Sequence, residues 1–410
     1  MKKEANFEEF IKRFIIVVLL GLLLGNLLVG FYGFLSKGSE NPDDFIMRYR
    51  ESKYLLKGIS PFDVILGKAE VDLEIGTLWD VAGYTPWGMA CGMWFNFAFL
   101  SEKYARGMFL ILYISVMLLA AFVTYRIVSK EYSKKISIII TLIVLVIPGW
   151  STGLTWLNAG AVFGALLYFS VLILDEKPVL AGILIGIAAT KPQLAAPFYL
   201  ALLLKKKWKV FAIAAFVPIA AWGMALILTK TSPLYILQQF LGLTDELIGS
   251  LGNWITSLDV YYNLYFGGDT LQRIGMFLCI LFALYIWGLM IKNGVKDNLS
   301  FFSVAALLSG MWTYSQSHDR TVLMIVILCM VIRFKRLICC RKKYLLIIGV
   351  FLTSCIMDSE RLAQMQSSVM AIGNNPVRFY DLLKYIIWIA ILLFIASVST
   401  EELFDKKIEN

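Results

Sequence analysis

Residues 14–36 read FIIVVLLGLLLGNLLVGFYGFLS, and this stretch decides the class of fold. It carries no charged side chain and exceeds the ~20 apolar residues that a helix needs to cross a bilayer. Comparable apolar stretches recur along the 410-residue chain, whose hydrophobic fraction is 59% and whose mean hydropathy is +0.74. Because backbone groups in lipid must be hydrogen-bonded within the protein, such stretches indicate helices. The sequence therefore predicts an all-α polytopic membrane protein.

The apolar stretches predict about 12 transmembrane helices in a single integral-membrane domain over residues 1–410. Several are shorter than a full crossing, so we expect these to be extended by polar residues or to stop inside protein or a water-filled cavity. The expected spans are residues 14–36, 104–126, 136–150, 158–174, 179–190, 193–204, 210–229, 274–291, 299–313, 321–333, 344–358 and 382–399.

Basic residues gather in short runs between the apolar stretches. With the N-terminus placed in the cytoplasm, more than half of the 38 Lys and Arg residues fall in the short inner segments, which is the positive-inside pattern. We therefore expect a multi-pass protein of the cell (plasma or inner) membrane. Both termini, residues 1–13 and 400–410, are expected in the cytoplasm. The net charge of +9 then reflects topology and contact with membrane lipids, and no nucleic-acid partner is expected.

This topology leaves two long outer loops, residues 37–103 and 230–273. Residues 84–100 (YTPWGMACGMWFNFAFL) are apolar enough to cross, but a crossing there would place the basic run that ends the next helix outside. We therefore expect residues 84–100 to be re-entrant or to lie at the interface. The first outer loop would then carry juxtamembrane helices.

Two adjacent acids stand where the chain leaves the first apolar stretch, in SENPDDFIMRYRESKYLLKGISPFD, residues 39–63. The sequence Asn-Pro-Asp-Asp is typical of a helix start, so capping accounts for either Asp43 or Asp44. The other carboxylate is a candidate general base, whose pKa burial and a partner could move toward neutrality. The six cysteines show no ligand spacing, and the sequence indicates no metal site.

Several further motifs follow one another in the region 14–333: Asp44, Tyr49, Leu55-Leu56-Lys57-Gly58, Pro61-Phe62-Asp63, Tyr84-Thr85-Pro86, the stretch AGILIGIAATKPQLAAPFYLALLLKKKWK (181–209) and WTYSQSHDRTVL (312–323). In this order they resemble the membrane glycosyltransferases of the GT-C class, and glycosyltransferase family 87 most closely. That family contains mannosyltransferases that use polyprenyl-phosphate mannose. The sequence departs from the family pattern at Trp87, which replaces a second Pro. It also departs at STGLTWLN (151–158), where only Asn158 is kept.

The resemblance implies a GT-C-like bundle and an inverting glycosyltransferase. Such an enzyme would move a mannose-like hexose or a pentose from a polyprenyl-phosphate sugar to a hydroxyl of a glycolipid or cell-envelope polysaccharide, at the outer face of the membrane. This chemistry needs one base and no general acid, since phosphate leaves as an anion, unlike the acid and base pair of most glycosidases. No cofactor and no metal ion are expected.

The resemblance also implies roles for particular residues. Asp44 is expected to be the base, with Asp43 orienting it. Lys191 follows only twelve apolar residues, a depth at which an unpartnered Lys is costly, and His318 is the only histidine. With Arg320, these two are expected to bind the donor phosphate. Tyr49, Tyr84 and Asn158 are expected to contact substrate.

Two other classes of protein fit a chain of this composition. A transporter or flippase for lipid-linked sugars would place ionisable residues near helix centres and show paired repeats, whereas polar residues here gather in the outer loops. An O-antigen polymerase or ligase would carry a large late outer loop rich in Arg, whereas the main outer loop here is the first.

Overall fold

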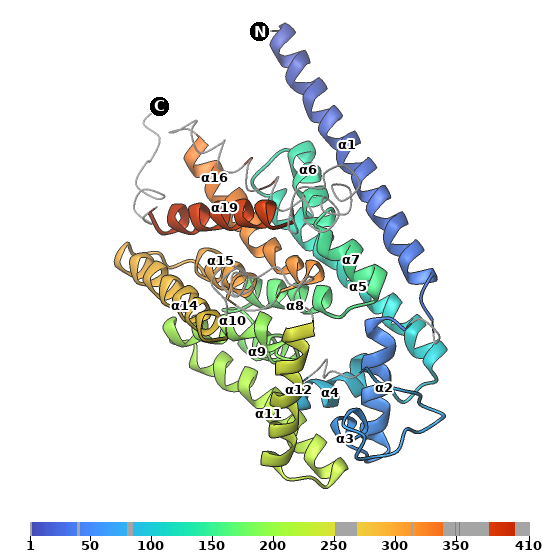
Figure 1. Ribbon diagram of the computed structural model, residues 1–410. Coiled ribbons are helices and arrows are strands. Elements are labelled where there is room, and N and C mark those ends of the chain that lie inside the picture. Colours follow the sequence, from blue (N-terminus) through green and yellow to red (C-terminus); the bar gives the residue numbers. More distant parts are fainter. Residues whose placement is uncertain are drawn as a thin grey trace. The chain divides into compact units, whose positions relative to one another are not determined.

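In a computed structural model, helices joined by turns and irregular segments make up the described residues, which are 2–38, 42–79, 85–250, 269–312, 315–338 and 377–397, with Gly349 and Leu352 alone. Within these ranges no strand is present (Figure 1). The helices are α1 (Lys2–Leu35), α2 (Asp44–Leu56), α3 (Pro61–Ile65), α4 (Pro86–Phe95), α5 (Glu102–Val128), α6 (Lys134–Leu145), α7 (Pro148–Trp156), α8 (Gly160–Leu172), α9 (Pro178–Ala188), α10 (Pro192–Leu204), α11 (Trp208–Thr229), α12 (Pro233–Ser250), α14 (Asp269–Lys292), α15 (Asn298–Ser309), the 3₁₀ helix η1 (Ser317–Leu323), α16 (Met324–Ile338) and α19 (Val377–Ser397).

Five helical stretches of the described residues are long and apolar enough to cross a membrane: Phe7–Leu35, Glu102–Val128, Lys134–Trp156, Trp208–Thr229 and Ile274–Lys292. Large apolar side chains on the first of them are exposed, such as Leu24 at 60%. Exposed apolar surface of this extent marks a helix that meets lipid. The chain is therefore a multi-pass membrane protein, and the all-α fold class is confirmed for the described residues.

Several apolar helices are shorter. The 13 residues of α8 span about 20 Å at 1.5 Å per residue, less than the ~30 Å hydrocarbon core. Its side chains are buried on nearly every face. Such helices fit the expectation that short apolar stretches stop inside protein.

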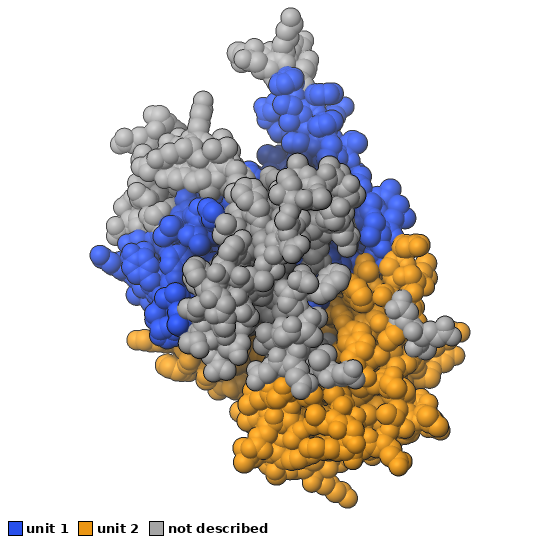
Figure 2. All heavy atoms as spheres, viewed as in Figure 1, with its two compact units in different colours: residues 1–30, 117–152, 256–410 blue, residues 31–116, 153–255 orange. Residues whose placement is uncertain are grey.

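The chain divides into two compact units, coloured separately in Figure 2. Unit 1 contains Met1–Gly30, Met117–Thr152 and Thr256–Asn410, and unit 2 contains Phe31–Val116 and Gly153–Ile255. In unit 1, α15 packs on α14, α16 and α19. Asp297 caps α15 by accepting from the Ser300 N–H at 2.7 Å, and accepts from Arg333 Nη2 of α16 at 2.9 Å.

In unit 2, α9 and α11 lie side by side because α9 presents glycines to its neighbour (Figure 1). A Cβ added at Gly186 would lie 2.6 Å from Val217 Cβ and 2.8 Å from the backbone oxygen of Ala214. Gly182 is equally close to α11, with its nearest contact at 2.8 Å from Ile213 Cβ. Small residues four apart allow this close approach of two apolar helices.

We expect Gly186→Ala to destabilise the protein by about 1–3 kcal/mol, because the added methyl group meets backbone that cannot rotate away. The midpoint of thermal unfolding in detergent measures this. Gly223→Ala on α11 is the matched control, since no atom lies within 4 Å of an added Cβ there. An unchanged midpoint for Gly186→Ala would contradict the packing described above.

The structure adds detail to two expected ranges. The stretch 230–273, expected to be a second long outer loop, contains the 18-residue helix α12, which starts at Pro233 with the Ser232 hydroxyl accepting from the Tyr235 N–H at 3.2 Å. The expected span 136–150 lies within the candidate span Lys134–Trp156, which is divided into α6 and α7 because Pro148 interrupts the hydrogen bonding. Within 84–100, α4 has only 10 residues, too few to cross a bilayer. The expected span 344–358 lies outside the described residues, apart from Gly349 and Leu352.

Candidate active site

Asp43 caps the helix that follows it. Its backbone is extended, its Oδ1 accepts from the Ile46 N–H at 2.9 Å, and its Oδ2 accepts from Arg106 Nη2 at 2.8 Å. The side chain has no exposed surface. Burial raises the pKa of Asp43 above its ordinary value, although the Ile46 N–H and the Arg106 guanidinium oppose this. The cap expected from Asn-Pro-Asp-Asp is therefore supplied by Asp43.

Arg106, in the second turn of α5, joins three parts of unit 2. Besides Asp43, its Nη2 donates to the backbone oxygen of Phe34 at 2.8 Å, and its Nη1 donates to that of Lys37 at 3.1 Å. Its guanidinium also lies 4.3 Å from the centroid of the Phe34 ring. One side chain thus satisfies carbonyls at the end of α1 and the cap of α2. Sequence reasoning missed Arg106; the available signal was a cation near the start of an apolar helix.

Asp44 is the first residue of α2, and its surroundings differ from those of Asp43. It is half-buried, and its Oδ2 accepts from Asn158 Nδ2 at 2.6 Å. Asn158 is itself 8% exposed, and its Oδ1 accepts from the Gly160 N–H at 2.7 Å. Within the described part of the chain, no other hydrogen bond reaches the Asp44 carboxylate. The two adjacent acids therefore differ: both carboxylate oxygens of Asp43 accept hydrogen bonds, whereas only Oδ2 of Asp44 accepts one from the described residues.

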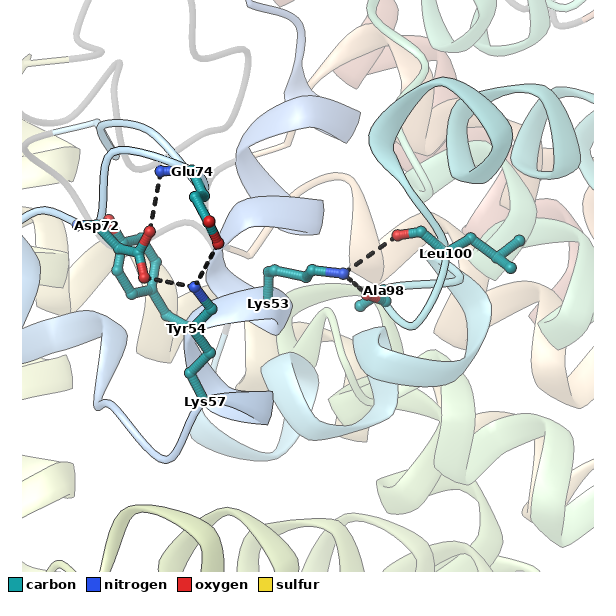
Figure 3. A network of polar contacts seen from close by, with 7 residues as sticks. All are labelled: Lys53, Tyr54, Lys57, Asp72, Glu74, Ala98 and Leu100. Carbon is teal, nitrogen blue, oxygen red and sulfur yellow. Dashed lines mark hydrogen bonds and ion pairs between the residues drawn. The ribbon is translucent and has the colours of Figure 1, made fainter.

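The rest of α2 is held by the segments that follow it in the chain (Figure 3). Lys53 Nζ donates to the backbone oxygens of Ala98 at 2.9 Å and Leu100 at 3.2 Å, in the turn between α4 and α5. On the other side, Lys57 pairs with Asp72 and Glu74 (Figure 3). These contacts fix the helix that carries Asp44 along its length.

Tyr49, expected to contact substrate, is 5% exposed, and its hydroxyl donates to the Leu100 backbone oxygen at 2.8 Å. Its ring stacks on Phe45 with centroids 6.1 Å apart. This geometry gives Tyr49 a structural role beside Lys53, and substrate contact by Tyr49 remains a prediction.

Two other motifs singled out in the sequence meet in unit 2. Thr85 caps α4, and Trp87 Nε1 donates to the Ala189 backbone oxygen at 2.8 Å, in the turn that carries Lys191. Lys191 precedes Pro192 at the start of α10 and is 7% exposed. A Cβ at Gly88 would lie 3.2 Å from the Thr190 oxygen, so α4 and this turn are in close contact. Tyr84, directly before this contact, lies outside the described residues.

His318 and Arg320 belong to unit 1, whereas Asp44 belongs to unit 2. Both lie in η1 and are buried, at 3% and 4% exposed. His318 Nε2 lies 3.6 Å from Asp319 Oδ1, and Asp319 Oδ2 accepts from the Gln316 N–H at 3.2 Å. Among the described residues, no group of three or more His, Cys, Asp or Glu side chains could hold a metal ion.

Comparison with known proteins gives one result. The sequence matches glycosyltransferase family 87 over residues 84–339. This range contains Asn158, Lys191, His318 and Arg320, whereas α2 and its two acids precede it. No curated protein and no solved structure matches the chain.

Proposed function

Since the chain belongs to glycosyltransferase family 87, we propose that this membrane glycosyltransferase takes a sugar from a polyprenyl-phosphate sugar. It transfers that sugar with inversion of configuration at the anomeric carbon. The acceptor is a hydroxyl of a glycolipid or cell-envelope polysaccharide. The sugar is mannose-like or a pentose. The helices form a GT-C-like bundle of about 12 crossings. Some of these crossings use apolar stretches that are shorter than a complete span.

The difference between the two acids carries this proposal. A general base must meet the acceptor hydroxyl within hydrogen-bonding distance. Asp43 has no exposed surface and both of its oxygens are bonded. Asp44 is half-buried, and only its Oδ2 is bonded among the described residues. Asp44 is therefore the acid suited to act as the base.

In the reaction, the acceptor oxygen forms a bond to the anomeric carbon while its proton passes to the Asp44 carboxylate. The bond from the anomeric carbon to the phosphate oxygen breaks, and polyprenyl phosphate leaves with the bonding electrons. No acid is needed for this leaving group. Asp44 later returns its proton to water.

The leaving phosphate needs fixed positive charge or hydrogen-bond donors. Lys191 is a suitable group because it is a buried cation in the same compact unit as Asp44. Its turn is also held by α4, which packs on α2. We include His318 and Arg320 in the proposal as further phosphate ligands from unit 1. The excess of Lys and Arg in the short inner segments supports an outward-facing site with both termini in the cytoplasm.

We expect the purified protein in lipid nanodiscs to transfer sugar from polyprenyl-phosphate mannose, or a related polyprenyl phosphosugar, without loss of rate in EDTA. Lys191→Ala should raise the KM for the donor by about 10-fold or more, the effect of losing a charge-assisted hydrogen bond. Spheroplasts given a soluble acceptor from outside should glycosylate it. Transfer from a nucleotide sugar instead, or rescue of EDTA-treated protein by Mg²⁺ or Mn²⁺, would contradict the donor class. Glycosylation only after permeabilisation would contradict the orientation.

A further inference from the structure

We propose that Asn158 is a positioning residue for Asp44, rather than a substrate ligand, and that it selects which carboxylate oxygen faces the acceptor. This inference rests on the proposed role of Asp44. Asn158 and Asp44 are 114 residues apart in sequence and are joined by the 2.6 Å hydrogen bond from Nδ2 to Oδ2. The bond leaves Oδ1 as the oxygen that can accept a proton.

The orientation of the Asn158 amide follows from its own contacts. Its oxygen accepts from the Gly160 N–H at 2.7 Å, which only an oxygen can do. The nitrogen must therefore point to Asp44, as a donor. Rotation of the amide away from Asp44 would break both of these bonds, so the two contacts fix the orientation in which Nδ2 donates to Asp44.

The backbone before Asn158 forms a hydrogen-bonded turn that fixes where Asn158 lies. The Asn158 N–H donates to the Gly153 oxygen at 2.8 Å, and the Leu157 N–H donates to the Leu154 oxygen at 3.3 Å. Leu157 has φ +46°, so α7 ends in a Schellman motif with Leu where Gly is usual. A bulky residue held in this conformation is strained, and such strain gathers where geometry must be fixed.

The end of α7 is fixed in turn against the end of α1. A Cβ at Gly33 would clash with the Thr155 side chain, so the two helices touch there. Lys37 Nζ lies 4.1 Å from the centroid of the Trp156 ring. The same end of α1 is held by Arg106, which also binds the cap of α2. The end of α7, which precedes Asn158, and the start of α2, which carries Asp44, are therefore both attached to the end of α1.

We expect Asn158→Ala and Asn158→Asp to lower kcat by about 10- to 100-fold, the scale of a misplaced reacting group, and to leave the donor KM within about twofold. The acid limb of the kcat–pH profile should move to higher pH. A donor to the carboxylate favours its ionised form, and a neighbouring carboxylate disfavours it. Asn158→Asp should therefore move the limb further than Asn158→Ala.

These substitutions leave the other charged groups near Asp44 unchanged: Asp43 next to it, Arg106, which pairs with Asp43, and Arg48 one turn along α2. Of the other helices that pack on α2, α3 carries Asp63 and α11 carries Lys209. Helix α4, which also packs on α2, contributes none. Asn293→Ala is the matched control, since its amide donates to a backbone oxygen, that of Ala396, at 2.7 Å. It should leave kcat and the pH profile unchanged.

Three outcomes would overturn the inference: wild-type kcat in both Asn158 variants, a raised donor or acceptor KM with unchanged kcat, or a lower kcat with the acid limb in place. Asp44→Asn measured in the same assay separates the two proposals. If Asp44→Asn is inactive and the Asn158 variants behave as wild type, only the positioning role fails. If Asp44→Asn is active, the proposed function fails.

Discussion

Replacing Asp44 with Asn is expected to slow glycosyl transfer by about 10²-fold or more, the usual contribution of a general base. The substitution keeps the size of the side chain but removes the basic oxygen. Asn also suits the first turn of a helix, so α2 should form as before. Steady-state transfer with a saturating polyprenyl phosphosugar measures the effect, and the thermal unfolding midpoint confirms that the protein is folded.

Asp72→Asn is the matched control for this variant. Asp72 lies in the same segment between α1 and α5 and pairs with Lys57 at the surface, as shown in Figure 3. Exposed ion pairs contribute little, so we expect near-normal activity and stability. Equal losses in Asp44→Asn and Asp72→Asn would point to general disturbance of the loop, and the role of Asp44 would have to be abandoned.

Replacing Arg106 with Ala is expected to destabilise the protein by about 2–3 kcal/mol. This is at or below the low end of the cost of breaking a buried ion pair, because the Arg106 side chain is 18% exposed. The variant leaves Asp43 buried without its cation, and it removes donors from the Phe34 and Lys37 carbonyls. The midpoint of thermal unfolding in detergent measures the loss. Arg126→Ala, at an exposed position in the last turn of the same helix, should change it little.

A double-mutant cycle identifies the cause of this loss. Asn caps a helix about as well as Asp, so Asp43→Asn removes the charge and keeps the cap. If the ion pair causes the loss, Asp43→Asn should cost less in the Arg106→Ala background than alone. Strictly additive effects would mean that Arg106 acts through the α1 carbonyls and not through Asp43.

The sequence was sufficient where local rules decide the outcome. The apolar stretches predicted the helices, and Asn-Pro-Asp-Asp predicted the cap at the start of α2, because both depend on residues close together in the chain. The motifs between residues 44 and 86, the Lys-Pro turn and the His-containing segment led to the family, which the match over residues 84–339 confirms.

The sequence was insufficient where distant residues meet. Nothing local pairs Asn158 with Asp44, or Arg106 with Asp43, because these contacts depend on how helix ends pack. Leu157 ends α7 in a conformation that usually calls for Gly, so the turn that aims Asn158 carried no sequence signal. Helix α12 was not anticipated, because residues 230–273 were expected only as a long outer loop between two apolar stretches.

The most direct test of the central claim is to compare kcat for Asp44→Asn and Asp43→Asn, each corrected for the folded fraction in the same nanodiscs. With Asp44 as the base, Asp44→Asn should fall about 10²-fold below wild type, while Asp43→Asn should stay within about 10-fold and lose mainly stability. The reverse order, with a folded Asp43→Asn protein that is inactive and an Asp44→Asn protein near wild type, would contradict the account.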